Sequence, residues 1–214
     1  MIETNNIAST LAEKLLQIKA IKLSPQNPFT WASGWHSPIY CDNRKTLSYP
    51  DIRTLIKEAL SEQIKSQFKG VDMIAGVATA GIPHGALVAD YLNLPFIYVR
   101  SKPKAHGLTN SIEGEIKGGE KIVVIEDLIS TGKSSLEVVH ALKDAGCNIL
   151  GLAAIFTYGF DISKLEFDKA NCPFFTLSNY DALIELAIEQ NYVEANELEA
   201  LKAWRENPDE WGKN

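Results

Sequence analysis

Short apolar strands alternate with amphipathic helices through the middle of this chain, and that alternation constrains its fold more than any other feature. Runs rich in β-branched or aromatic residues lie at 73–77, 96–99, 122–125 and 149–156. Helical patterns follow the first and third of these runs, at 81–92 and 134–145. We therefore predict an α/β fold in which helices cover both faces of a parallel sheet.

Further helical patterns flank this region at 7–20, from Pro50 to near Gly70, and at 182–190 and 194–205. The last two are expected to be packing elements without chemistry. A chain of 214 residues can fill one hydrophobic core and hardly two. We expect a single domain spanning residues 1–214.

Composition excludes several classes of function. The net charge of −6 argues against sequence-independent nucleic-acid binding, which needs a cationic face. The three cysteines lack CxxC spacing, so neither a disulfide framework nor a zinc cluster is indicated. No apolar run approaches the length of a membrane span, and acidic residues near the start argue against a targeting segment. We expect a cytoplasmic protein.

The segment 121–134 carries the strongest chemical signal. An apolar strand leads into Glu126 and Asp127, then into hydroxyl and small residues that open a helix. Backbone N–H groups and hydroxyls at a helix N-terminus favour a phosphate. The two carboxylates repel a phosphate, but they can accept hydrogen bonds from sugar hydroxyls and assist a Mg²⁺ held partly by a diphosphate. The predicted ligand is a phosphorylated sugar with free hydroxyls.

This segment has two other interpretations. The two acids could simply begin a solvated turn, with Ser130 capping the helix. The Gly132-Lys133-Ser134 triplet also matches the end of a P-loop, but that motif needs a glycine five positions before its GK glycine. Asp127 stands there instead and would repel a nucleoside triphosphate, so the sequence disfavours a P-loop.

Two further strand ends are candidates for binding. Residues 100–107 contain three permanent cations and His106, within a long aperiodic stretch typical of a lid. Such a lid suits a reaction with an anionic leaving group. Residues 77–85 have small side chains where the strand turns into a helix. These permit either close approach of the backbone to a phosphate or ordinary close packing of the helix on the sheet. His84 is expected to lie on a helix surface or to be a hydrogen-bonded structural histidine.

These loops resemble those of the type I phosphoribosyltransferases, enzymes that use 5-phosphoribosyl 1-diphosphate (PRPP). Residues 126–134 stand at that family's PRPP signature. The segment 29–44, FTWASGWHSPIYCDNR, resembles the substrate hood of the orotate-specific members, as does the spacing of Arg100, Lys104, His106 and Gly107. The resemblance covers about residues 24–135. It implies a Rossmann-like parallel sheet flanked by helices, with a small N-terminal hood contributed by residues 1–45.

The resemblance implies transfer of ribose 5-phosphate from PRPP to orotate, giving orotidine 5′-phosphate and diphosphate in the de novo pyrimidine pathway to UMP. Mg²⁺ is the implied cofactor, and no residue is assigned as its ligand. The implied partners are the small molecules PRPP and orotate and a second copy of the chain, in a homodimer whose cationic lid reaches into the neighbouring site.

Roles carried over from the family fall on individual positions of this sequence. The implied catalytic residues are Lys104, His106 and Asp127. The implied PRPP contacts are Arg100, Lys104, His106, Glu126, Asp127, Leu128, Ile129, Ser130, Thr131, Gly132, Lys133 and Ser134. Orotate would contact Ser130 and Tyr40.

The chain departs from some members of the family. Ala32 and Ser101 stand where those members have lysines, and residues 157–160 read TYGF where others carry an arginine for the orotate carboxylate. Backbone N–H groups of the hood are the expected substitute. Competing functions are a purine or uracil phosphoribosyltransferase, a PRPP-sensing regulator, and a hydrolase built on Cys41 and His36.

Overall fold

The computed structural model describes residues 4–31, 33–100 and 111–212. Six strands form the central sheet: β5 (Met73–Val77), β6 (Phe96–Val99), β7 (Ile112–Glu113), β8 (Lys121–Ile129), β9 (Asn148–Thr157) and β10 (Phe174–Asn179). Their spatial order is β10-β9-β8-β5-β6-β7. Every neighbouring pair is parallel except β6 and β7. The predicted α/β fold with a parallel sheet is confirmed.

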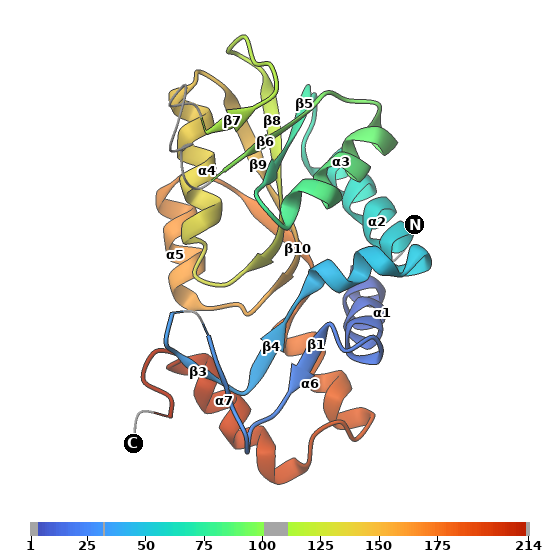
Figure 1. The fold of residues 1–214 in the computed structure, drawn as a ribbon, viewed down its shortest axis with the longest axis vertical. Helices are drawn as coiled ribbons and strands as arrows, with labels where there is room; N and C mark the ends of the chain where they lie inside the picture. Colours follow the sequence, from blue (N-terminus) through green and yellow to red (C-terminus); the bar gives the residue numbers. More distant parts are fainter. Residues whose placement is uncertain (1–3, 32, 101–110, 213–214) are drawn as a thin grey trace.

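Helices cover both faces of this sheet (Figure 1). They are α1 (Thr4–Gln17), α2 (Pro50–Gln67), α3 (Gly81–Leu92), α4 (Lys133–Asp144), α5 (Asp161–Lys169), α6 (Tyr180–Glu189) and α7 (Leu198–Glu206), with short 3₁₀ helices η1 (Asn43–Ser48) and η2 (Ala195–Glu197). No helix in the described ranges is long and apolar enough to cross a membrane.

The two faces of the sheet bury separate sets of apolar side chains, because successive residues of a strand point in opposite directions. On β8, Ile122 and Val124 pack in a cluster with residues of α4 and α5. Val123 and Ile125 belong to the opposite cluster, together with residues of α2 and α3. Burial on both faces accounts for the continuous apolar runs in the sequence.

A hood of short strands lies beyond one end of the sheet, beside α6 and α7 (Figure 1). It consists of two antiparallel pairs, β1 (Ile21–Leu23) with β4 (Ile39–Cys41), and β2 (Phe29–Thr30) with β3 (His36–Ser37). Trp31 stacks on Tyr158 with ring centroids 5.2 Å apart and meets the edge of Trp204 at 5.7 Å. Because Trp204 is fully buried, aromatic packing joins the hood to the main body.

Some element boundaries differ from the sequence predictions. The strand expected to end at residue 125 continues to Ile129, because β8 and β9 stay paired through Ile129 and Thr157. Glu126 and Asp127 therefore lie within a strand. Strand β10 was missed, since its polar residues obscure the apolar run and its pairing with β9 is what makes it a strand. Helix α5 was also missed.

Small residues at the start of α3 allow it to lie directly on the sheet. A Cβ atom added to Gly81 would overlap the carbonyl oxygen of Ile125, and one on Gly85 would come 2.7 Å from the Phe96 ring. The Gly81 contact is with the backbone of the buried strand β8, which cannot move away cheaply. Close helix–sheet packing thus explains the glycines of residues 77–85 without a ligand.

Gly81→Ala should lower the free energy of unfolding by about 1–3 kcal/mol, the usual range for overpacking a core. Urea denaturation measures this change. Ala86→Ser adds one heavy atom to the exposed face of the same helix and should change stability by less than about 0.5 kcal/mol. Equal effects of the two substitutions would contradict the proposed contact.

Candidate active site

The site is built around two adjacent carboxylates near the carboxyl end of β8. The Glu126 side chain is buried, with 4% of the residue exposed. Its Oε2 accepts a hydrogen bond of 3.0 Å from the Ser135 hydroxyl, and its Oε1 accepts one of 3.0 Å from the backbone N–H of Asp127. A solvated turn at this position is therefore excluded. Ser135, one residue beyond the segment singled out from the sequence, is a site residue that the sequence analysis missed.

Asp127 is tied to the exit of the hood. The amide Nδ2 of Asn43 donates a 2.7 Å hydrogen bond to the backbone carbonyl of Asp127. Strand β5 pairs with β8 only as far as Ile125, so beyond that point the buried Asn43 amide provides a hydrogen bond from another element. Nothing in the local sequence around Asn43 indicated this long-range contact.

Burial dominates the electrostatics of the two acids. It raises the pKa of Glu126 well above its ordinary value, and repulsion by Asp127 adds to the shift. Burial also raises the pKa of Asp127, while the positive charge of Arg44 opposes part of that effect. A carboxyl whose pKa is raised well above its ordinary value holds its proton more readily, so Glu126 can either accept from or donate to the hydroxyls of a sugar.

The segment predicted to bind a phosphate, which we call the cradle (residues 128–134), runs from the end of β8 into the start of α4. Gly132 adopts a left-handed φ of 82° ahead of α4, and a Cβ there would lie 2.8 Å from the Phe167 ring, so glycine is required. No side chain of the described residues caps this helix, which leaves its first N–H groups open to an anion. Lys133 and Ser134 are exposed, and Ser130 and Thr131 are partly exposed.

Of the other predicted substrate contacts, the structure describes Arg100 and Tyr40 only. Arg100 follows β6, and its guanidinium lies 2.9 Å from the carboxylate of Glu113 on β7. Lys104 and His106 lie outside the described residues. Tyr40 projects from β4 of the hood with 40% of its surface exposed, its ring 5.7 Å from that of Phe29.

Two histidine predictions can be examined. His84 is only 2% exposed, so the predicted helix-surface position was wrong, and its Nε2 has no hydrogen-bond partner among the described residues. Burial lowers its pKa to about 4, which keeps the ring neutral. His36 lies near Thr30, whereas the Cys41 thiol donates to the Asn43 side chain. Burial raises the pKa of Cys41, and a thiol kept protonated is a poor nucleophile.

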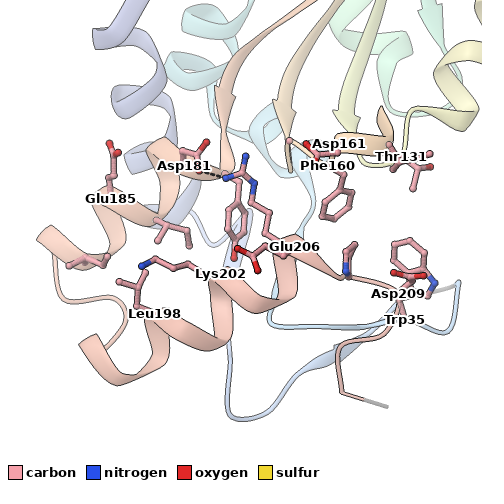
Figure 2. Close-up of a pocket in the computed structure, with 17 residues that line it drawn as sticks. Trp35, Thr131, Phe160, Asp161, Asp181, Glu185, Leu198, Lys202, Glu206 and Asp209 are labelled. Carbon is pink, nitrogen blue, oxygen red and sulfur yellow. Dashed lines mark hydrogen bonds and ion pairs between the residues drawn. The ribbon is translucent and has the colours of Figure 1, made fainter. Parts of the chain in front are cut away.

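A separate pocket of about 900 Å³ adjoins the cradle (Figure 2). It extends from Thr131 and Trp35 along Phe160 to the C-terminal helices. Five acids and two cations line it: Asp161, Asp181, Glu185, Glu206, Asp209, Lys202 and Arg205. The excess of acids disfavours a phosphate there, so the N-terminus of α4 stays the predicted anion site.

The residues present fit a divalent cation only in part. Among the described residues no group of three or more His, Cys, Asp or Glu side chains could hold a metal ion. Mg²⁺ prefers oxygen ligands and is commonly bound by one or two carboxylates together with substrate phosphates. Glu126 and Asp127 can supply carboxylate oxygens to a cation that arrives with such a substrate.

Comparison with known proteins places this geometry in a family. A model of the phosphoribosyl transferase domain matches residues 46–186. Among curated proteins, the orotate phosphoribosyltransferase of Bacteroides fragilis is 55% identical over 96% of this chain and 97% of its own length. That of Listeria innocua is 56% identical over 97% of this chain and 100% of its own length. A solved orotate phosphoribosyltransferase from Aeropyrum pernix, 24% identical, shares the fold with a TM-score of 0.75 and covers 86% of this chain and 99% of its own.

The fold, the acid pair and the cradle thus define a phosphoribosyltransferase. The two close relatives match nearly their whole length, which agrees with the hood segment of the sequence. The chain belongs to the orotate phosphoribosyltransferase family.

Glu126→Gln should keep the fold and stabilise it at neutral pH by about 0.5–2 kcal/mol, a gain typical of removing a strained functional group. Because folding raises the pKa of Glu126 above its ordinary value of 4.5, the folded protein holds a proton on Glu126 at pH values where the unfolded chain has lost it. The stability of the wild type therefore falls relative to that of the variant as the pH rises above 4.5. Below pH 4.5 Glu126 is protonated in both states, and the two proteins should be equally stable.

Chemical denaturation from pH 4 to pH 8 tests this expectation. The exposed Glu137→Gln on α4 serves as the matched control and should show no such pH dependence. A Glu126→Gln variant less stable than wild type at pH 8 would show that the ionised carboxylate is not costly to bury.

Proposed function

We propose that this chain catalyses the transfer of ribose 5-phosphate from PRPP to orotate, giving orotidine 5′-phosphate and diphosphate in de novo pyrimidine biosynthesis. The observation that carries the proposal is the acid pair on β8, with Glu126 buried and Asp127 half-buried, followed directly by an uncapped helix N-terminus. A ribose 5-phosphate needs both features, one for its hydroxyls and one for its phosphate.

In the proposed complex, the 5′-phosphate lies against residues 128–134 and the ribose hydroxyls against Glu126 and Asp127. Breaking the bond to diphosphate develops positive charge on the ribose ring and negative charge on the departing oxygens. Asp127, the nearer acid to the hood, is positioned to hold the ribose for in-line attack by the orotate nitrogen and to favour the positive charge.

The leaving group requires cations. We assign Arg100, Lys104 and His106 to the diphosphate, as the resemblance to the phosphoribosyltransferases implies. Mg²⁺, when bound with PRPP, would neutralise further charge on the diphosphate. For Arg100 this role requires exchange of its present partner Glu113 for the diphosphate. Orotate is already an anion, so the reaction does not demand a strong general base.

Assembly and location extend the same proposal. We propose a homodimer in which the cationic segment of one subunit serves the site of the other, and a cytoplasmic location. Light scattering, which measures the molar mass in solution, tests for the homodimer. Mixing inactive variants that affect different parts of the site, such as Asp127→Asn and Lys104→Ala, should restore part of the activity if the segment is shared.

A PRPP-binding regulator is the alternative that uses the same cradle. It would bind PRPP without consuming it. Incubation of the purified chain with PRPP, Mg²⁺ and orotate separates the two, because transfer lowers the orotate absorbance and mere binding does not. Adenine, guanine and uracil in place of orotate test the other transferase classes.

Lys104→Ala should lower turnover by about 100- to 1,000-fold, the effect of removing one preorganised charge from a transition state. Steady-state kinetics with saturating PRPP and orotate measures it. Lys117→Ala, a loss of the same charge outside the site, should remain near wild type. Turnover of Lys104→Ala within about threefold of wild type would remove Lys104 from the catalytic residues.

A further inference from the structure

Glu126 and Asp127, the acids proposed to bind the ribose, would repel the anionic second substrate, orotate. Orotate brings a carboxylate next to the anomeric carbon, and therefore close to Asp127. Like charges at such short range repel each other strongly in a partly buried site. A cation must compensate, yet residues 157–160 of this chain contain none.

Arg44 is the candidate for that cation. It is the second residue of η1 and follows Asn43, whose side chain is bonded to the carbonyl of Asp127 at 2.7 Å. This hydrogen bond holds the turn that carries Arg44 beside the acid pair. The positive charge of Arg44 lowers the pKa of Asp127, and the negative charge of its partner Asp42 acts in the opposite direction.

The guanidinium of Arg44 is held by one hydrogen bond, and its terminal N–H groups remain available. Its Nε donates a 2.6 Å hydrogen bond to Oδ1 of Asp42, and the backbone N–H of Arg44 donates to the same oxygen at 3.2 Å. Neither terminal nitrogen of Arg44 has a hydrogen bond to another described residue, and 62% of the side chain is exposed. A planar group held at Nε presents its outer edge in the geometry that binds a carboxylate with two hydrogen bonds.

We propose that Arg44 determines specificity for the anionic base by binding the carboxylate of orotate, with the exposed ring of Tyr40 against the pyrimidine. This inference rests on the proposed transfer to orotate and adds the residue that selects the acceptor. Asp42 holds the guanidinium in position, and Asn43 ties it to the strand that carries the ribose acids.

Two other arginines near the site already have acidic partners. Arg205 is bonded to Asp181 and packs against Gly159, in the pocket with excess acid. Arg100 is paired with Glu113. Arg44 is paired as well, but through Nε, which leaves its terminal nitrogens without a hydrogen bond to another described residue.

Binding of two nucleotides that differ only in the carboxylate isolates this contact. Orotidine 5′-phosphate carries it, and UMP does not. Calorimetric titration of the full chain with each nucleotide should show that Arg44→Gln weakens orotidine 5′-phosphate binding by about 10- to 100-fold, as expected for lost hydrogen bonds to a charged group. UMP binding should stay within about twofold of wild type, since UMP makes no such bond.

Two companion variants sharpen the test. Arg44→Lys keeps the charge without the planar fork and should recover part of the lost affinity. Lys45→Gln removes the next cation in the turn, whose Nζ donates to the carbonyl of Lys19, and should leave both nucleotides unaffected. In steady-state kinetics Arg44→Gln should raise the KM for orotate and leave the KM for PRPP unchanged.

Each other result overturns the inference. Equal loss of both nucleotides would assign Arg44 to the ribose phosphate or to the fold, and a raised KM for PRPP would assign it to the diphosphate. No change in either nucleotide would show that Arg44 does not contact the base. A wild-type chain that neither prefers orotidine 5′-phosphate over UMP nor consumes orotate would instead refute the proposed function itself.

Discussion

The site depends on two adjacent carboxylates in one β-strand, of which Glu126 is buried and Asp127 half-buried. Such burial is costly unless hydrogen bonds compensate. The Glu126 carboxylate accepts them from the Ser135 hydroxyl and from the backbone N–H of Asp127, and the Asn43 amide donates to the backbone carbonyl of Asp127. Strand β8, helix α4 and the turn after the hood must therefore meet at one point, and this requirement fixes how the hood sits on the sheet.

Aromatic packing makes the second connection between hood and sheet. Trp31 of the hood lies against Tyr158 at the end of β9 and against Trp204 of α7. The C-terminal helix thus serves as a wall for the hood, although it contributes nothing to the acid pair. Distant parts of the chain meet around the carboxyl ends of the strands, as ligand sites in open α/β sheets commonly require.

The cations around the site complement this acidic strand. Arg44 is held by Asp42 beside Asp127, whereas Arg100 is held by Glu113 at the end of β6. Each guanidinium already has an acidic partner in the unliganded protein. Such pairing orients a charge before substrate arrives and lowers the reorganisation needed when anionic groups bind. The arrangement suits two substrates that both carry negative charge into an acidic pocket.

The sequence by itself determined the sheet, its alternation with helices, and the acid pair with the cradle at residues 126–134, because these features are encoded in local periodicity and in adjacent residues. Resemblance to a family predicted the hood segment and an orotate contact for Tyr40, and that contact stays a prediction. Tertiary structure decided that β8 continues past the acids, that Ser135 donates to Glu126, and that Asn43 donates to the backbone carbonyl of Asp127. It also decided that His84 is buried without a partner on Nε2 among the described residues. These facts depend on strand pairing and on contacts between residues far apart in the chain, such as Asn43 and Asp127, whose proximity no local pattern records.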